Sequence, residues 1–338
     1  MVQLYAALLS GPLLLGFAAQ SAPSAEPPTS PQTETPALPS ESESAISYDR
    51  NERMLLDVKV NQHTDAIFMV DTGSERTVVS DALAKRLSLP SDGRVTISGV
   101  AGTANVATAR VDTLGFDKVS ISNLVAPILQ RDHLGADGLL GVDSLQKKSV
   151  LFDFDKRQMH VREPRRALTA RASNPDEIVV VGKRLNGRLI FTNATIEGVD
   201  VTVVVDSGAQ YSIGNPALLA RLTSKRKIVD PTLTTLHSVT GQTMTATVAR
   251  AKRLYIGALL LSEVPVAYAS SPAFKTLGLD NKPALLLGMN TMRAFRQVEV
   301  DFVNRRVRFV TPGGARLGDE RRYADGCGAQ CGQATPAS

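Results

Sequence analysis

Two aspartates in matching contexts carry the chemistry that this sequence suggests. Asp71 and Asp206 each follow an apolar run and open a short turn, Asp-Thr-Gly in one case and Asp-Ser-Gly in the other. A carboxylate at the end of a buried strand is costly unless hydrogen bonds or a partner compensate for the lost water. The neighbouring hydroxyl, and the glycine that lets backbone N–H groups approach, can supply such bonds. Two such groups facing each other would share one proton, because like charges that close cannot both ionise; one then acts as base and the other as acid.

The two aspartates belong to an internal repeat. They lie 135 residues apart, and the same offset relates the residues that follow them without gaps. The matched pairs are Gly73 with Gly208, Thr77 with Ser212, Ala82 with Ala217, Leu83 with Leu218 and Leu87 with Leu222. Further landmarks recur in the same order, 98–103 with 237–242, 137–145 with 284–292, and 150–161 with 298–310. A chance match of one triplet would not extend so far, so the sequence predicts two homologous halves.

Each half has the pattern of a mostly β structure. Short alternating or β-branched runs, such as LLDVKV and AIFMV, are separated by Gly, Asn and Asp turns. Short helices are expected after Ser80 and after Asn215, where Pro216 suits the first helical turn. Two more are expected at about 143–148 and 290–294. These elements would place each aspartate at the end of a strand and pack a short helix beside it.

These residues resemble the retropepsin-like aspartic peptidases, in a bacterial two-lobe form carried on a single chain. The DTGS and DSGA segments at 71–74 and 206–209 match the active-site motif of that family, and LLG at 139–141 and 286–288 matches its downstream partner. The resemblance implies an all-β fold of two pseudo-two-fold-related β-barrel lobes with short helices, as in retropepsin and pepsin. It also implies an aspartic endopeptidase that hydrolyses peptide bonds in an extended peptide or protein substrate by activated water, without a cofactor.

The resemblance assigns roles to single residues. Asp71 and Asp206 become the catalytic pair, and Thr72 and Ser207 supply the hydroxyls that cross-bond the two loops. The other residues that support the active-site loops are Gly73, Ser74, Gly208 and Ala209. The flaps that cover the substrate are formed by Val100, Ala101, Gly102, Val239, Thr240 and Gly241.

The two halves are not identical in these segments. Neither flap contains the tyrosine typical of pepsin-like enzymes, and the chain has no Trp, so two small and similar flaps are expected in place of one large flap. Ser74 in the first loop is answered by Ala209 in the second. We expect the Ser74 hydroxyl to donate towards Asp71, which would make Asp71 the charged partner and Asp206 the protonated one.

The chain outside the repeat suggests an exported protein. Residues 1–22 are apolar and resemble a signal peptide. The basic segment that normally precedes the apolar run is missing, so the alternatives are an atypical signal peptide and an N-terminal anchor. Residues 23–49 are rich in Pro, Ser and Glu, as in a disordered linker. The remaining parts are a first lobe at 50–163, a connector at 164–186, a second lobe at 187–311 and a polar tail at 312–338. A periplasmic or secreted location is expected, with a membrane tether through the N-terminus as the alternative.

Composition narrows the class of protein. With 338 residues, 43% of them hydrophobic and 21% charged, the chain is long and apolar enough for two globular lobes. The net charge is +5, but no nucleic-acid-binding motif accompanies it, so no nucleic-acid partner is expected. The four histidines share no spacing, and no metal site is expected. Cys327 and Cys331 in the polar tail form either a local disulfide or two unpaired thiols.

Other functions remain open at this stage. A catalytically silent peptide-binding or scaffolding protein could use the same fold. A narrow processing enzyme, which cleaves one envelope partner or its own segments at 21–49 or 164–187, differs from a general endopeptidase only in substrate range.

Because both half-sites lie in one chain, the active unit is predicted to be the monomer. Peptide-hydrolysing activity per molecule should therefore stay constant on dilution, unlike that of an obligate dimer of single lobes. The measurement is specific activity over a wide range of protein concentration, with sedimentation in parallel. A steep loss of activity together with dissociation would contradict the prediction.

Overall fold

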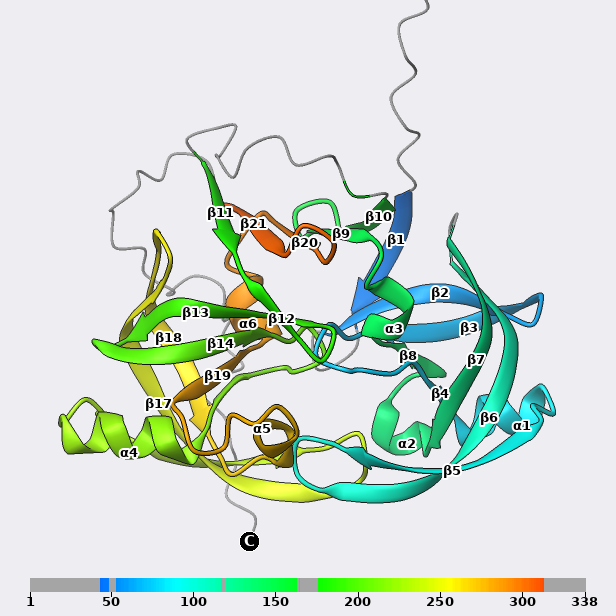
Figure 1. Ribbon diagram of the computed structural model, residues 1–338, viewed down its shortest axis with the longest axis horizontal. Coiled ribbons are helices and arrows are strands. Elements are labelled where there is room, and N and C mark those ends of the chain that lie inside the picture. The colour runs from blue at the N-terminus through cyan, green and yellow to red at the C-terminus, as the bar shows by residue number, and fades with distance from the viewer. Residues whose placement is uncertain (1–42, 49–52, 117–118, 163, 165–175, 313–338) are drawn as a thin grey trace, which may run out of the picture. The chain divides into compact units, whose positions relative to one another are not determined.

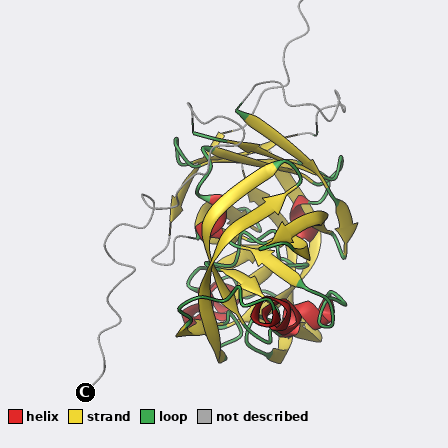
Figure 2. Ribbon diagram, turned by 90° about the vertical axis from the view of Figure 1, so that its left-hand side faces the viewer, coloured by secondary structure: helices red, strands yellow, loops and turns green. Residues whose placement is uncertain are grey.

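The computed structural model is mostly strands, with a few short helices (Figures 1 and 2). The residues predicted as a signal peptide or anchor, both cysteines and the tail beyond residue 312 lie outside the described residues. The predicted linker is described only at its end, where residues 43–48 form a strand. In the described part of the chain, no helix is long and apolar enough to cross a membrane. The described residues are 43–48, 53–116, 119–162, 164 and 176–312.

The elements follow the same order in both halves. The first half and the strand before it contain β1 (Glu43–Tyr48), β2 (Met54–Val60), β3 (His63–Val70), β4 (Val78–Ser80), α1 (Asp81–Arg86), β5 (Ser91–Ser98), β6 (Thr103–Phe116), β7 (Val119–Leu129), α2 (Arg131–Leu134), β8 (Gly138–Leu140), α3 (Val142–Leu145), β9 (Ser149–Asp153) and β10 (Gln158–Arg162). The second half contains β11 (Glu177–Val181), β12 (Lys183–Leu185), β13 (Arg188–Ile196), β14 (Val199–Val205), β15 (Ser212–Gly214), α4 (Pro216–Ser224), β16 (Thr232–His237), β17 (Thr243–Ile256), β18 (Leu259–Tyr268), α5 (Pro272–Thr276), β19 (Ala284–Leu287), α6 (Met289–Met292), β20 (Gln297–Asp301) and β21 (Arg306–Val310).

Strand pairing repeats as well. The first lobe has the strand order β3-β8-β4-β7-β6-β5, and the second has β14-β19-β15-β18-β17-β16. In the first lobe β3 and β8 are parallel, β8 and β4 are antiparallel, and β4 and β7 are parallel. The second lobe repeats this pattern, with β14 and β19 parallel, β19 and β15 antiparallel, and β15 and β18 parallel. The predicted two-lobe, all-β fold with short helices is therefore confirmed.

A crossing in each lobe positions the loop that holds the aspartate. β8 lies between β3 and β4, the two strands that the loop after Val70 connects. The loop must therefore pass over the end of β8, where Gly141 follows. A Cβ at Gly141 would overlap the backbone of Arg76 in the loop, and one at Gly288 would overlap that of Tyr211. The glycine of each LLG segment is thus required by close backbone packing beneath the loop.

The predicted helix starts are present. The Ser80 side chain accepts a hydrogen bond from the Leu83 N–H at the start of α1, and Asn215 accepts one from the Leu218 N–H at the start of α4. The helices after the LLG segments, α3 and α6, begin one residue earlier than predicted and end earlier. The helices α2 and α5 were not predicted, because each is only about one turn long and carries no periodic pattern.

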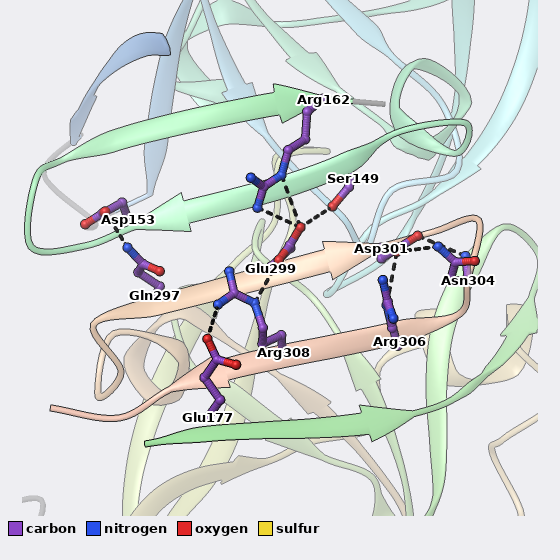
Figure 3. Close-up of polar contacts among 10 residues, drawn as sticks. All are labelled: Ser149, Asp153, Arg162, Glu177, Gln297, Glu299, Asp301, Asn304, Arg306 and Arg308. Atoms are coloured by element: carbon purple, nitrogen blue, oxygen red, sulfur yellow. Dashed lines mark hydrogen bonds and ion pairs between the residues drawn. The ribbon is translucent and has the colours of Figure 1, made fainter. Parts of the chain in front are cut away.

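A sheet shared by the two halves joins the lobes. Its order is β11-β21-β20-β9-β10-β1, so the last hairpin of each half pairs with that of the other (Figures 1 and 3). β9 and β20 are antiparallel, with Val150 opposite Val300 and Leu151 opposite Glu299. Strands β11 and β12 lie in the later part of the predicted connector. Phe152 and Phe309 from this sheet are fully buried in one hydrophobic core that contains residues of both lobes.

Glu299 is the centre of an ion-pair network across this sheet (Figure 3). Its Oε1 accepts from Arg162 at 2.8 Å and from the Ser149 hydroxyl at 2.7 Å, and its Oε2 accepts from Arg308 at 2.8 Å. Arg308 also donates to Glu177 in β11, at 2.8 Å. Burial opposes the ionisation of Glu299, but these donors outweigh it and lower its pKa to about 2. The carboxylate therefore stabilises the contact between the halves while it is charged.

We predict that Glu299→Gln lowers the free energy of unfolding at pH 7 by about 3 kcal/mol, because it leaves Arg162 and Arg308 without their shared carboxylate. A lowered pKa contributes stability that is complete above the unfolded value and is lost as the pH falls through about 2. Urea unfolding from pH 7 down to pH 2 should therefore show the two proteins converging at the acid end.

The matched control is Asp155→Asn, since the Asp155–Arg296 pair has side chains that are 53% and 49% exposed. Its effect should be small. An equal effect of both substitutions at pH 7 would show that the network does not stabilise the shared sheet.

Candidate active site

Each predicted aspartate lies directly after a central strand. Asp71 follows β3, and its backbone N–H donates to the Leu140 carbonyl at 3.0 Å. Asp206 follows β14, and its N–H donates to the Leu287 carbonyl at 3.1 Å. These carbonyls belong to the last residues of β8 and β19. The LLG segments therefore fix the position of the first residue of each aspartate loop.

The two loops are bonded to each other through their second residues. The Thr72 N–H donates to the Ser207 hydroxyl at 3.0 Å, and that hydroxyl donates to the Val70 carbonyl at 3.0 Å. The reciprocal pair has the Ser207 N–H donating to the Thr72 hydroxyl at 3.0 Å, which donates to the Val205 carbonyl at 3.1 Å. Both side chains are almost completely buried. The four bonds hold the loops in a two-fold arrangement.

This arrangement brings the two carboxyl groups together over the glycines. A Cβ at Gly73 would overlap the carboxyl group of Asp206, and a Cβ at Gly208 would overlap that of Asp71. Each glycine thus makes room for the aspartate of the opposite lobe. Asp206 is 8% exposed and Asp71 is partly buried.

Backbone groups of each loop bind its own carboxylate. The Gly73 N–H donates to Asp71 at 2.8 Å, and the Gly208 and Ala209 N–H groups donate to Asp206 at 3.1 Å each. The prediction that the Ser74 hydroxyl donates to Asp71 is wrong, because that hydroxyl donates to the Arg76 carbonyl at 2.9 Å. A hydroxyl has one proton to donate, so it cannot serve both.

Burial raises the pKa of both carboxyl groups. For Asp206 the nearby charge of Asp71 adds to the effect of burial, and its pKa reaches about 7. For Asp71 the Gly73 N–H, the Arg188 charge and the Asp206 carboxyl group oppose the effect of burial. These causes favour Asp206 as the holder of the shared proton and Asp71 as the charged partner. The Ser74 hydroxyl, on which the expectation rested, is not among them.

Arg188 is a residue near the pair that the sequence reasoning missed. It begins β13 in the second lobe, and its guanidinium donates to the Gly73 carbonyl and to Glu75 in the first lobe, the latter at 2.6 Å. Its charge lowers the pKa of both aspartates. The repeat could have identified it, because Arg53 stands at the same offset in the first half and lines the same cavity.

A cavity of about 370 Å³ contains both aspartates and lies between the lobes. On the first-lobe side it is lined by the apolar residues Val78, Leu129 and Leu139, and on the second-lobe side by Ile213, Leu236 and Leu286. Among the residues that the structure describes, no cluster of three or more His, Cys, Asp or Glu side chains is arranged to hold a metal ion.

The predicted flap loops are two similar hairpin turns, β5–β6 and β16–β17. Their tips touch, because Gly99 lies against the side chains of Ser238 and Thr240, and Gln242 donates to the Thr103 carbonyl at 3.4 Å. The predicted flap residues that line the cavity are Val100, Val239 and Thr240, whereas Ala101, Gly102 and Gly241 do not.

Each flap tip packs against the other half of the molecule. Val100 from the first lobe contacts the apolar cluster around Leu236, and Val239 from the second contacts the cluster around Leu129. Gly241, at φ +88°, lies against the ring of His133 in α2. The cavity is therefore roofed by both hairpins.

We predict that Arg188→Gln raises the pKa of both Asp71 and Asp206, because it removes the cation that favours their charged forms. The measurement is the pH titration of the two carboxyl groups, followed by ¹³C NMR of the aspartate side chains. Arg188→Lys should shift them less, since it keeps the charge. Arg184→Gln, at an arginine that donates to the Phe302 carbonyl, is the control. Titrations that do not move, or that move to lower pH, would contradict the prediction.

Comparison with known families agrees with this geometry. A family model described as gag-polyprotein putative aspartyl protease matches residues 56–147, and one described as Aspartyl protease matches residues 192–291. No curated protein matches the chain. The two matches stand in tandem, and each contains one of the two aspartates and the strands that position it. The chain therefore belongs to the retropepsin-like aspartic protease family, with one family domain in each of its two lobes.

Proposed function

We propose that the chain is an aspartic endopeptidase that hydrolyses peptide bonds with water activated between Asp71 and Asp206. The observation that carries the proposal is the placement of the two carboxyl groups, each packed against the glycine of the opposite lobe. The cross-bonds of Thr72 and Ser207 preorganise this pair before a substrate arrives. The family membership supports an aspartic protease activity and a peptide substrate.

In the proposed reaction, Asp71 acts as the base and Asp206 as the acid. The Asp71 carboxylate takes a proton from water as the water oxygen bonds to the peptide carbonyl carbon, and Asp206 gives its proton to the carbonyl oxygen. The resulting diol collapses when Asp71 gives its proton to the leaving nitrogen and the C–N bond breaks, while Asp206 takes a proton from a diol hydroxyl. The products are a carboxylic acid and an amine, and the pair again holds one proton.

The protonation of the pair sets the pH range of this chemistry. The reactive state has one proton, on Asp206, whose pKa is raised to about 7 by burial and by the charge of Asp71. This state therefore persists up to about pH 7 and is lost above it. Arg188 keeps Asp71 charged towards lower pH, because its cation opposes the effect of burial.

The substrate in this proposal is an extended peptide that passes between the aspartates and the flaps. The apolar walls next to the pair, such as Leu129 and Leu236, suit aliphatic or aromatic side chains on both sides of the cleaved bond. Since the flap tips touch each other, they must separate to admit a chain and close again over it.

We predict that Asp71→Asn and Asp206→Asn each abolish hydrolysis of a diverse peptide pool, by at least about 10³-fold, because either change removes the proton-sharing pair. The test uses purified protein that keeps the whole of β1, with cleavage followed by mass spectrometry and folding by thermal unfolding. The matched control is Asp57→Asn, at an exposed aspartate on β2 outside the cavity, which should keep full activity.

The outcomes separate the proposal from its alternative. Near wild-type turnover in either folded active-site variant would show that the two aspartates do not act as a pair. A wild-type protein that binds peptides but cleaves none would favour the catalytically silent peptide-binding function.

A further inference from the structure

We propose that Arg76 makes the peptidase selective for substrates with an acidic side chain on the first-lobe side of the cleaved bond. The inference rests on the proposed function and adds the chemistry of a substrate side chain. It concerns the rim of the cavity, beyond the apolar walls that flank the two aspartates.

Arg76 lies in the loop that carries Asp71, five residues further along the chain. It lines the cavity, and its side chain is exposed. Its backbone is held firmly, because its carbonyl accepts the Ser74 hydroxyl at 2.9 Å and packs against Gly141 without room for a Cβ. The Thr77 N–H next to it donates to Asp143 at 2.9 Å. A cation on such a loop is presented to the substrate from a rigid base.

The charge of Arg76 is available to a ligand. Among the described residues, no hydrogen bond or ion pair engages its guanidinium. The nearest acid in the sequence, Glu75, is already bound by Arg188 at 2.6 Å. A guanidinium at a cavity edge binds a carboxylate well, because its planar donors can make two parallel bonds.

The second lobe lacks a cation at the matching place. The residue that answers Arg76 in the repeat is Tyr211, which is 37% exposed and lines the same cavity. Gln210 answers Glu75 in the same way. The cavity edge therefore carries a cation at Arg76 in the first lobe and an uncharged side chain at Tyr211 in the second, although the apolar residues that line the two sides are alike. Selection by the charge of a substrate side chain is expected on the Arg76 side alone.

The experiment compares pairs of peptides that differ only by Glu or Gln at one position, scanned along both sides of a cleaved bond. For wild type, kcat/KM should favour Glu on the order of five-fold at one position on one side, and the preference should shrink in about 0.5 M salt. Arg76→Gln should remove the preference, and Arg76→Glu should replace it with a preference for Lys over Gln. The control Arg221→Gln, on the exposed face of α4 outside the cavity, should leave it unchanged.

Two further variants sharpen the assignment. Tyr211→Arg should create a second Glu preference on the other side of the bond. If Arg53→Gln removes the wild-type preference while Arg76→Gln keeps it, then Arg53, which also lines the cavity, is the determinant and the inference is wrong. Equal rates for Glu and Gln at every position would also overturn it.

A binding assay keeps this inference distinct from the proposed hydrolysis. The same Glu and Gln peptides, labelled with a fluorophore, are titrated by anisotropy into Asp71→Asn alone and into Asp71→Asn with Arg76→Gln. Tighter binding of the Glu peptide that is lost in the double variant supports the role of Arg76 even if no bond is cleaved. Equal binding of the two peptides, or no binding of either, refutes it.

Discussion

The site depends on four hydrogen bonds across the two loops, two between Thr72 and Ser207 and two from their hydroxyls to the Val205 and Val70 carbonyls. They are buried, reciprocal and made by residues that each adjoin an aspartate, so they fix the distance between the two carboxyl groups. The glycines that follow are a consequence of this distance, because any side chain there would occupy the space of the opposite carboxyl group. Burial then raises both pKa values, and the small differences between the loops decide which carboxyl keeps the proton.

The two halves keep the same backbone yet solve local problems with different side chains. Asp143 accepts from the N–H and hydroxyl of Thr77, whereas Asn290 accepts from Ser212 and uses its amide to donate to the Pro265 carbonyl. In the shared sheet, Glu299 of the second half has Leu151 of the first half opposite it. Such differences show that the backbone keeps its pseudo-symmetry with unlike side chains, even beside the loops that carry the two aspartates.

Much of the fold and the position of the two aspartates could be predicted, because the repeat compares the sequence with itself. Matching landmarks located the aspartate loops, the LLG segments and the hairpin turns, and local rules located the starts of α1 and α4. Most of what failed depends on contacts between segments far apart. Arg188 reaches from the second lobe to Glu75, and the last hairpins pair with each other. No local pattern encodes these pairings. The Ser74 hydroxyl failed for a local reason, because it donates to the Arg76 carbonyl two residues further along the chain.

The shared sheet also determines when the site can assemble as the chain is made. Glu299 bonds to Ser149, 150 residues earlier, and β21 follows it, so this sheet can form only after strands of both lobes have been synthesised. Contacts of such long sequence separation form slowly, and domains made first fold first. The first lobe therefore emerges from the ribosome with a single aspartate loop and no opposite partner. Order of synthesis alone keeps the carboxyl pair from existing until the second lobe has also been made.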